Sequence, residues 1–286
     1  MSTPPAPVKV RLRSLAPASG LFWLRRGFRT FFRRPGGFMG LFAFVLLLLV
    51  VSMMLPAALR LVAIVLMPLM SLGFMLATED VLNDLPLRPS VFWAPLTMGR
   101  AQLRALLTIG LVYVAASVLI VFFGDVIDGG EASRWMEQVM TPRADGQMPE
   151  IPLLSGVGTA VLLLKTFGMA LVSVPLWHAP ALVHWGRQGA AQAMFSSVVS
   201  IWRTRAAFLV YIMGWFVVLF LFTLAISVFA AIFGAAPLAL VALTPVSWAL
   251  SAVFYTSIWF CFVDTFEITP TVAYHTVMAD TDTPAP

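Results

Sequence analysis

Six long apolar runs constrain the fold of this 286-residue chain more than any other feature. Each run is long enough to cross about 30 Å of hydrocarbon as an α-helix, which rises about 1.5 Å per residue. The runs are continuously apolar rather than alternating, which favours helices over the strands of a membrane barrel. The predicted spans are 38–56, 61–78, 104–123, 152–176, 207–233 and 237–263.

The composition leads to the same class. The chain is 60% hydrophobic and 11% charged, whereas a typical soluble domain is about half apolar and about a quarter charged. A soluble fold of this size could not keep so much apolar surface away from water. The composition therefore excludes a disordered chain and a secreted globular enzyme, and a single cysteine, Cys261, excludes an intrachain disulfide.

Short links between neighbouring runs predict hairpins. Only Pro56–Arg60 separates the first two spans, and only Gly234–Pro237 separates the last two. We therefore predict an all-α, polytopic transmembrane helical bundle whose six spans form three hairpins within residues 38–263. Each hairpin follows a segment that we expect to lie at the membrane interface, and the clearest of these are 14–37 and 187–206.

The distribution of Lys and Arg predicts the orientation. Most of these 18 residues lie in segments that share one side of the membrane, and only Arg60, Arg134 and Arg143 lie in segments on the other. We therefore expect both termini to be cytoplasmic. The terminal segments are predicted to be a Pro-rich disordered tail, 1–13, and a second cytoplasmic tail, 264–286.

The predicted periplasmic loop, 124–151, is rich in acidic residues and has room for a short helix around residues 132–140. A solvated cap is the simpler interpretation. Cation capture is the alternative, although the acids lack the spacing of a calcium-binding loop.

Segment 21–34 has the pattern of a basic amphipathic helix. On a helical wheel its apolar residues fall within about 100° of one another, beside a basic arc. Such a helix is suited to lie in a headgroup layer with its apolar face down. The apolar residues are Leu21, Leu24, Phe28, Phe31 and Phe32, and the candidate lipid-headgroup ligands are Arg25, Arg26, Arg29, Arg33 and Arg34. Because aromatic and basic residues fall on separate faces, we expect anionic lipid as the partner and no nucleic acid.

Lys165 is the candidate polar residue within the membrane. It lies near the middle of the fourth predicted span, where a charge costs at least about 2.5–3.5 kcal/mol and is a functional candidate by default. The predicted spans offer hydroxyl groups as partners, such as Thr108, Tyr113, Ser251 and Tyr255. A lysine that ties helices together is the structural alternative to one that binds an anion.

Three segments carry a resemblance to a known family. They read PASGLFWLRRGFRTFFRRPGGF, ATEDVLNDLPLRPSVFWAPL and APALVHWGRQGAAQAMFSSVVSIWRTRAAF. The chain between Pro17 and Phe266 resembles an uncharacterised family of polytopic Gram-negative inner-membrane proteins with about six transmembrane helices. The resemblance implies a polytopic fold in the bacterial inner membrane and carries over no catalytic residues.

No enzymatic motif is present: there is no phosphate-binding loop, no metalloprotease helix and no nucleophile elbow. We therefore expect no catalysis, no cofactor and no metal. The leading hypothesis is a membrane-organising or accessory protein that contacts anionic lipid and has a membrane-protein partner not yet identified. The alternative is a transporter or channel for a small or anionic solute that uses Lys165.

Overall fold

The computed structural model describes residues 9–97, 99–140, 153–233 and 236–269. Within these ranges six helical segments are long and apolar enough to cross a membrane, so the all-α polytopic fold with six spans is confirmed. The spans are built, in chain order, from α2 (Pro35–Met53), α3 (Ala57–Val65) with α4 (Met67–Leu82), α5 (Arg100–Asp128), α7 (Gly156–Ser173), α10 (Arg205–Phe233) and α11 (Ala236–Thr265).

Shorter elements lie at the ends of the spans. Near the chain termini are β1 (Lys9–Leu12), α1 (Ser19–Arg33), η1 (Pro89–Phe92), η2 (Ala94–Thr97), η3 (Val174–Leu176), α8 (Ala179–His184), α9 (Ala190–Arg203) and β2 (Phe266–Thr269). At the opposite end is α6 (Glu131–Met140). We refer to these two ends as the terminal end and the distal end.

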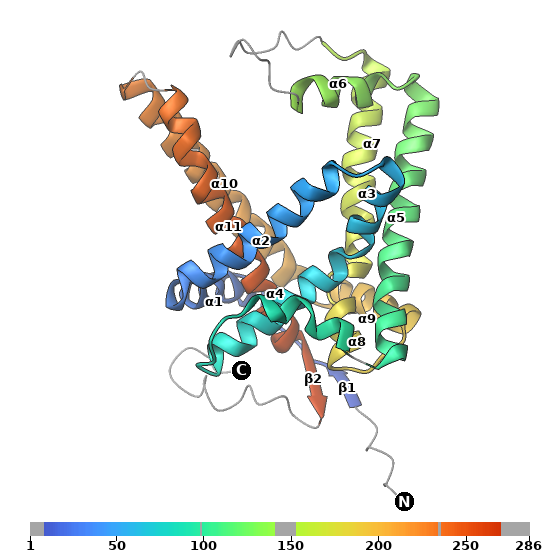
Figure 1. The fold of residues 1–286 in the computed structure, drawn as a ribbon, viewed down its shortest axis with the longest axis vertical. Helices are drawn as coiled ribbons and strands as arrows, with labels where there is room; N and C mark the ends of the chain where they lie inside the picture. Colours follow the sequence, from blue (N-terminus) through green and yellow to red (C-terminus); the bar gives the residue numbers. More distant parts are fainter. Residues whose placement is uncertain (1–8, 98, 141–152, 234–235, 270–286) are drawn as a thin grey trace, which may run out of the picture.

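The spans form two arms that diverge toward the distal end (Figure 1). One arm is the pair α5 and α7, which pack against each other, and α3 packs against α5. The other arm is the pair α10 and α11. Helix α2 rises obliquely between the arms from the end of α1 and contacts α11.

The prediction of a disordered tail over residues 1–13 is wrong for Lys9–Leu12. These residues form β1, which pairs antiparallel with β2, so that Lys9 lies opposite Thr269 and Leu12 opposite Phe266. The predicted tail 264–286 likewise begins with the last turn of α11 and with β2. Pairing between segments so distant in sequence satisfies backbone groups that local composition cannot reveal. It also brings the two ends of the described chain together.

Every helix differs from its predicted span by a few residues at one end or both, and the second span is also interrupted. The third helix continues to Asp128, so residues 124–128 are helical rather than loop, and α6 begins at Glu131. The second span is divided at Leu66, two residues before Pro68, because proline cannot donate the backbone hydrogen bond that a continuous helix requires.

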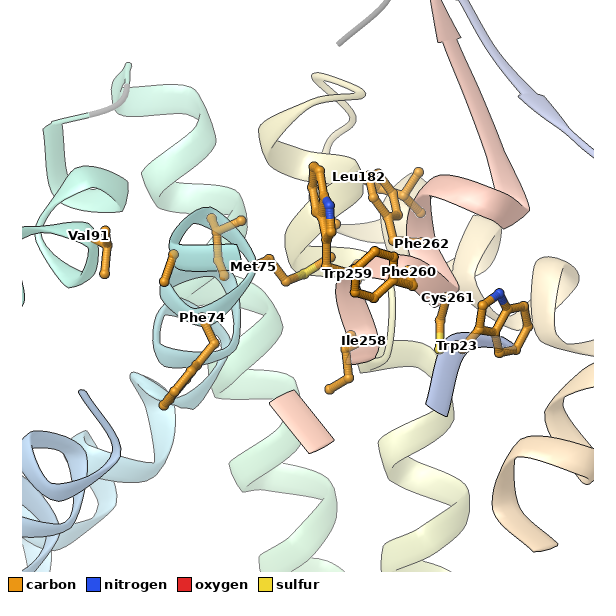
Figure 2. Packing of buried hydrophobic residues seen from close by; sticks show 14 of the residues in the cluster. Trp23, Phe74, Met75, Val91, Leu182, Ile258, Trp259, Phe260, Cys261 and Phe262 are labelled. Carbon is orange, nitrogen blue, oxygen red and sulfur yellow. The ribbon is translucent and has the colours of Figure 1, made fainter. Parts of the chain in front are cut away.

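A cluster of buried aromatic and aliphatic residues lies near the terminal end. Figure 2 shows Trp23 of α1 beside Cys261 of α11, with Phe260 and Phe262 on the same helix and Leu182 of α8 close by; all of these side chains are buried. The aromatic and aliphatic residues of α1, α4, α8 and α11 therefore form one core that fixes α1 against the spans.

Candidate functional site

Helix α1 packs against α10 and α11 through a face that the sequence analysis missed. Its buried residues recur at helical spacing: Gly20, Trp23, Gly27, Thr30 and Phe31. The predicted apolar face included Phe31, but that side chain is only 4% exposed and belongs to the packed face. Two glycines seven residues apart were the signal that could have revealed it.

The glycines permit close approach of backbones. A Cβ atom at Gly20 would lie 2.6 Å from the backbone nitrogen of Tyr211, and one at Gly27 would lie 2.6 Å from Cβ of Ser257. Both separations are too short for ordinary contact. The absence of side chains at these two positions therefore sets the distance of α1 from α10 and α11.

Of the other predicted apolar residues, Leu24 is partly buried and packs against the core, whereas Leu21 and Phe32 lie on the outer surface of α1. Leu21 is 53% exposed and Phe32 is 67% exposed. Phe28, which is half-buried, stacks on Phe32 with ring centroids 6.5 Å apart and on Trp215 of α10 with centroids 6.0 Å apart. This apolar strip is therefore continuous with the surface of α10.

The five candidate arginines divide into two groups. Arg25, Arg29, Arg33 and Arg34 have exposed side chains. Arg26 points instead toward the end of α11, where its Nη1 atom lies 3.1 Å from Oδ2 of Asp264. Arg26 therefore holds α1 in place, whereas the other four lie on the exposed side of the segment.

Asp264 receives a second hydrogen bond, which Trp23 Nε1 donates to Oδ2 at 2.9 Å. Because Asp264 is a carboxylate at the end of a long apolar helix, both contacts stabilise it where bulk water is limited. Sequence reasoning assigned Asp264 to a tail and gave Trp23 no role. The pairing of residues more than 200 positions apart left no local signal for either.

The exposed arginines of α1 lie beside the apolar strip. Arg25 and Arg29 precede Phe28 and Phe32 by three positions each, which places each pair on neighbouring parts of the helix surface. Guanidinium groups form bidentate hydrogen bonds with phosphate oxygens. The outer surface of α1 thus complements both parts of an anionic lipid: the arginines match its phosphate, and the apolar side chains match its acyl chain.

Helix α9, within the segment 187–206, is built in the same way. Its small residues Ala193, Ser197 and Ser200 are buried, whereas Phe195 is 70% exposed and Trp202 is 71% exposed. On both α1 and α9, some large apolar residues therefore remain outside, while small residues contribute to the packed face.

Lys165 has partners other than those expected. Its Nζ atom lies 2.6 Å from Oδ1 of Asp125 and 2.8 Å from Oγ of Ser133, so α7 is tied to α5 and α6. Asp125 was assigned to the outer loop, but α5 extends far enough to include it. The lysine is thus held within an ion pair and a hydrogen bond near the distal end, which is the arrangement expected of a lysine that ties helices together.

Two more acidic residues of the predicted loop accept hydrogen bonds in the same region. Asp128 accepts hydrogen bonds from the backbone nitrogens of Gly130 and Ala132, both at 2.8 Å, at the start of α6. Glu131 accepts hydrogen bonds from the backbone nitrogen of Ser155 at 2.7 Å and from its hydroxyl at 2.5 Å. These bonds hold the pKa of Glu131 below its ordinary value of 4.5. Within the described ranges, no three His, Cys, Asp or Glu side chains are grouped so as to hold a metal ion.

Comparison with known proteins agrees with the architecture. The six apolar helices define the class of polytopic membrane proteins. The chain is similar to a protein of Burkholderia thailandensis named as a probable inner membrane protein, with 27% identity over 251 residues, which cover 87% of this chain and 92% of that protein. No family model matches the chain, and no solved structure matches it. This chain is accordingly a multi-pass inner-membrane protein.

Proposed function

We propose that this protein is a non-enzymatic membrane-organising or accessory protein that binds anionic lipid on the outer surface of α1. The ligands are Arg25, Arg29, Arg33 and Arg34, and Arg26 positions the helix by pairing with Asp264. The observation that carries the proposal is the division of α1 into a packed glycine face and an outer surface that is both basic and apolar.

Packing of α1 against the spans makes binding more favourable. A basic residue near an anionic membrane surface contributes about 1 kcal/mol. Four arginines on a helix already fixed to the bundle can act together without the cost of ordering that helix. The exposed Leu21 and Phe32 supply the apolar contact that completes an interfacial helix.

The proposal includes an orientation and a partner. Both termini are cytoplasmic, because most Lys and Arg residues then lie on the cytoplasmic side. This places α1 at the inner leaflet, whose anionic lipids attract basic segments. An accessory role also requires a membrane-protein partner, which would contact the spans through their outward-facing apolar residues.

Lys165 has no ligand-binding role in the proposed function. Its ammonium group is engaged by Asp125 and Ser133 at the distal end, and such engagement favours a structural role over transient binding of an anion. A transporter or channel that uses Lys165 is therefore the weaker alternative.

The test is a lipid titration of the full-length protein in detergent. Phosphatidylglycerol and phosphatidylcholine with identical chains are added, and native mass spectrometry counts the bound lipids. The wild type should bind more phosphatidylglycerol, and a variant with Arg25, Arg29, Arg33 and Arg34 all changed to Gln should bind the two lipids equally. A control with Arg60→Gln and Arg134→Gln, at the distal end, should keep the preference. An unchanged preference in the four-residue variant would contradict the proposal.

A further inference from the structure

An apolar groove lies between α2, α10 and α11. Its cavity has a volume of about 500 Å³, and its lining includes Phe42, Leu49, Trp215, Leu219, Ser251 and Tyr255. Leu219 is 49% exposed, so the groove opens on the outside of the bundle, where a membrane would surround it. Its volume falls within the range of about 300–1,000 Å³ that is usual for small-molecule sites.

The groove adjoins the outer surface of α1. Trp215, which lines the groove, stacks on Phe28, and Phe28 stacks on Phe32 at the outer surface. Arg25 and Arg29 lie about one helical turn before these two phenylalanines. A continuous path therefore leads from the basic residues of α1, across two aromatic rings, into the groove.

The length of this path suits a lipid chain. At a rise of about 1.5 Å per residue, Phe42 lies about 12 Å along α2 from Arg34, and Leu49 lies about 22 Å from it. Because α2 runs obliquely in Figure 1, the corresponding depths are smaller than these lengths. One leaflet of hydrocarbon is about 15 Å thick. An acyl chain as long as one leaflet is therefore long enough to reach the groove from the end of α1.

We propose that the groove holds one acyl chain of an anionic phospholipid whose phosphate lies against Arg25 and Arg29. This inference rests on the proposed function and makes it specific: the protein holds a single lipid at a defined site, in addition to the lipids that surround any span. The charge of α1 selects the headgroup, and the apolar lining of the groove accepts the chain.

The experiment uses the full-length protein in nanodiscs that contain a small fraction of photoreactive lipid. Two probes carry a diazirine in the distal half of the acyl chain and differ only in headgroup, phosphatidylglycerol or phosphatidylcholine. Cross-linked peptides are located by mass spectrometry. The phosphatidylglycerol probe should label peptides of α2, α10 and α11 that line the groove. With Arg25→Gln and Arg29→Gln together, this labelling should fall by about tenfold, toward that of the phosphatidylcholine probe.

A groove-filling variant separates the chain site from the headgroup site. Among the residues that the structure describes, the hydroxyl of Ser251 bonds only within its own helix, to the carbonyl of Ser247 at 2.9 Å. Ser251→Phe therefore adds a ring to the groove without breaking a described hydrogen bond between helices. The matched control is Ser227→Phe on α10, where the hydroxyl makes the same type of bond to Thr223 on an exposed surface. Ser251→Phe should abolish groove labelling, and Ser227→Phe should leave it unchanged. If Ser251→Phe does not fold, Ser247→Phe fills the same groove.

The outcomes distinguish this inference from the proposed function. Groove labelling that is absent, while the four-residue arginine variant still loses its lipid preference, would overturn the inference and leave the proposed function intact. Groove labelling that is equal for both headgroups and insensitive to Arg25 and Arg29 would also overturn it. A wild-type protein that shows no headgroup preference in either experiment would contradict both the inference and the proposed function.

Discussion

Arg26 of α1 and Asp264 at the end of α11 form an ion pair, with Nη1 and Oδ2 3.1 Å apart. The two side chains are only 15% and 21% exposed. The pair joins the first helix of the chain to the last, and the neighbouring strands β1 and β2 join the two ends again. Its effect is to turn one arginine of the basic segment inward and to leave the other four outside.

Breaking this pair should loosen α1. Arg26→Gln removes the ion-pair partner of the Asp264 carboxylate, and we expect the free energy of unfolding to fall by about 2–3 kcal/mol, somewhat less than for a fully buried pair. Cys261, the one cysteine of the chain, is buried one turn before Asp264, so its reaction with a thiol-specific dye on heating reports this unfolding. Arg29→Gln removes an exposed charge and should change the midpoint temperature of this unfolding little. Equal shifts in the two variants would mean that the ion pair does not anchor α1.

Adding one methyl group at Gly20 should separate α1 from α10. The new Cβ would lie 2.6 Å from the backbone nitrogen of Tyr211, which cannot move aside as a flexible side chain can. We expect Gly20→Ala to destabilise the protein by about 1–3 kcal/mol. Gly40→Ala is the control, because nothing lies within 4 Å of its Cβ position and alanine favours helices by about 1 kcal/mol. Thermal unfolding followed by circular dichroism compares the two, and a Gly20→Ala protein as stable as Gly40→Ala would refute the close approach of the two helices.

Lys165 and Asp125 should be energetically coupled. Either Lys165→Met or Asp125→Asn leaves a charged partner without its counter-ion, and each should cost about 1–3 kcal/mol. The double variant removes both charges and should cost less than the sum of the single variants. Unfolding of the four proteins in nanodiscs gives the coupling energy. Strict additivity would show that the 2.6 Å contact contributes nothing.

Contacts between α6 and α7 should weaken in acid. Because the folded-state pKa of Glu131 is held below its ordinary value of 4.5, this carboxylate contributes stability above that value. The contribution is lost as the pH falls through the lowered pKa. We expect the amides of Ser155 and Gly158 to keep their hydrogen-exchange protection at pH 7 and to lose it in acid, after correction for the intrinsic exchange rate.

Glu131→Gln should remove this pH dependence, since a neutral amide cannot titrate. Glu137→Gln, on the same helix, should retain it. Protection in the Glu131→Gln protein that varies with pH as in the wild type would assign the effect to another group.

The six spans could be predicted from the sequence because the length of an apolar run depends only on neighbouring residues in the chain. The runs around Val45, Leu119 and Leu219 are apolar enough to be recognised without any knowledge of their neighbours. The chain reversal near Pro56 was equally clear, whereas the turn predicted at Gly234 lies outside the described residues. The prediction was weaker at span ends, where α5 continues through the charged Asp125, because the partner that stabilises this residue, Lys165, lies 40 positions away.

The candidate site was predicted in part. The helical wheel of segment 21–34 separated basic from apolar residues. It treated all five arginines as headgroup ligands and all the apolar residues as a membrane-facing surface. It could not show that Trp23 and Gly27 face α11 or that Arg26 has a carboxylate to bind, because those contacts depend on how distant helices meet. The groove beside Trp215 likewise exists only through the placement of three helices.

Direct measurement of the lipids around the protein in its own membrane tests the central claim. The full-length protein is excised from bacterial inner membrane with a styrene–maleic acid polymer, and the ratio of anionic to zwitterionic phospholipid in the particles is compared with that of the bulk membrane. Wild type should be enriched in anionic lipid, and the variant with Arg25, Arg29, Arg33 and Arg34 changed to Gln should match the bulk. Identical ratios in the two proteins would contradict the account of α1 as an anionic-lipid surface.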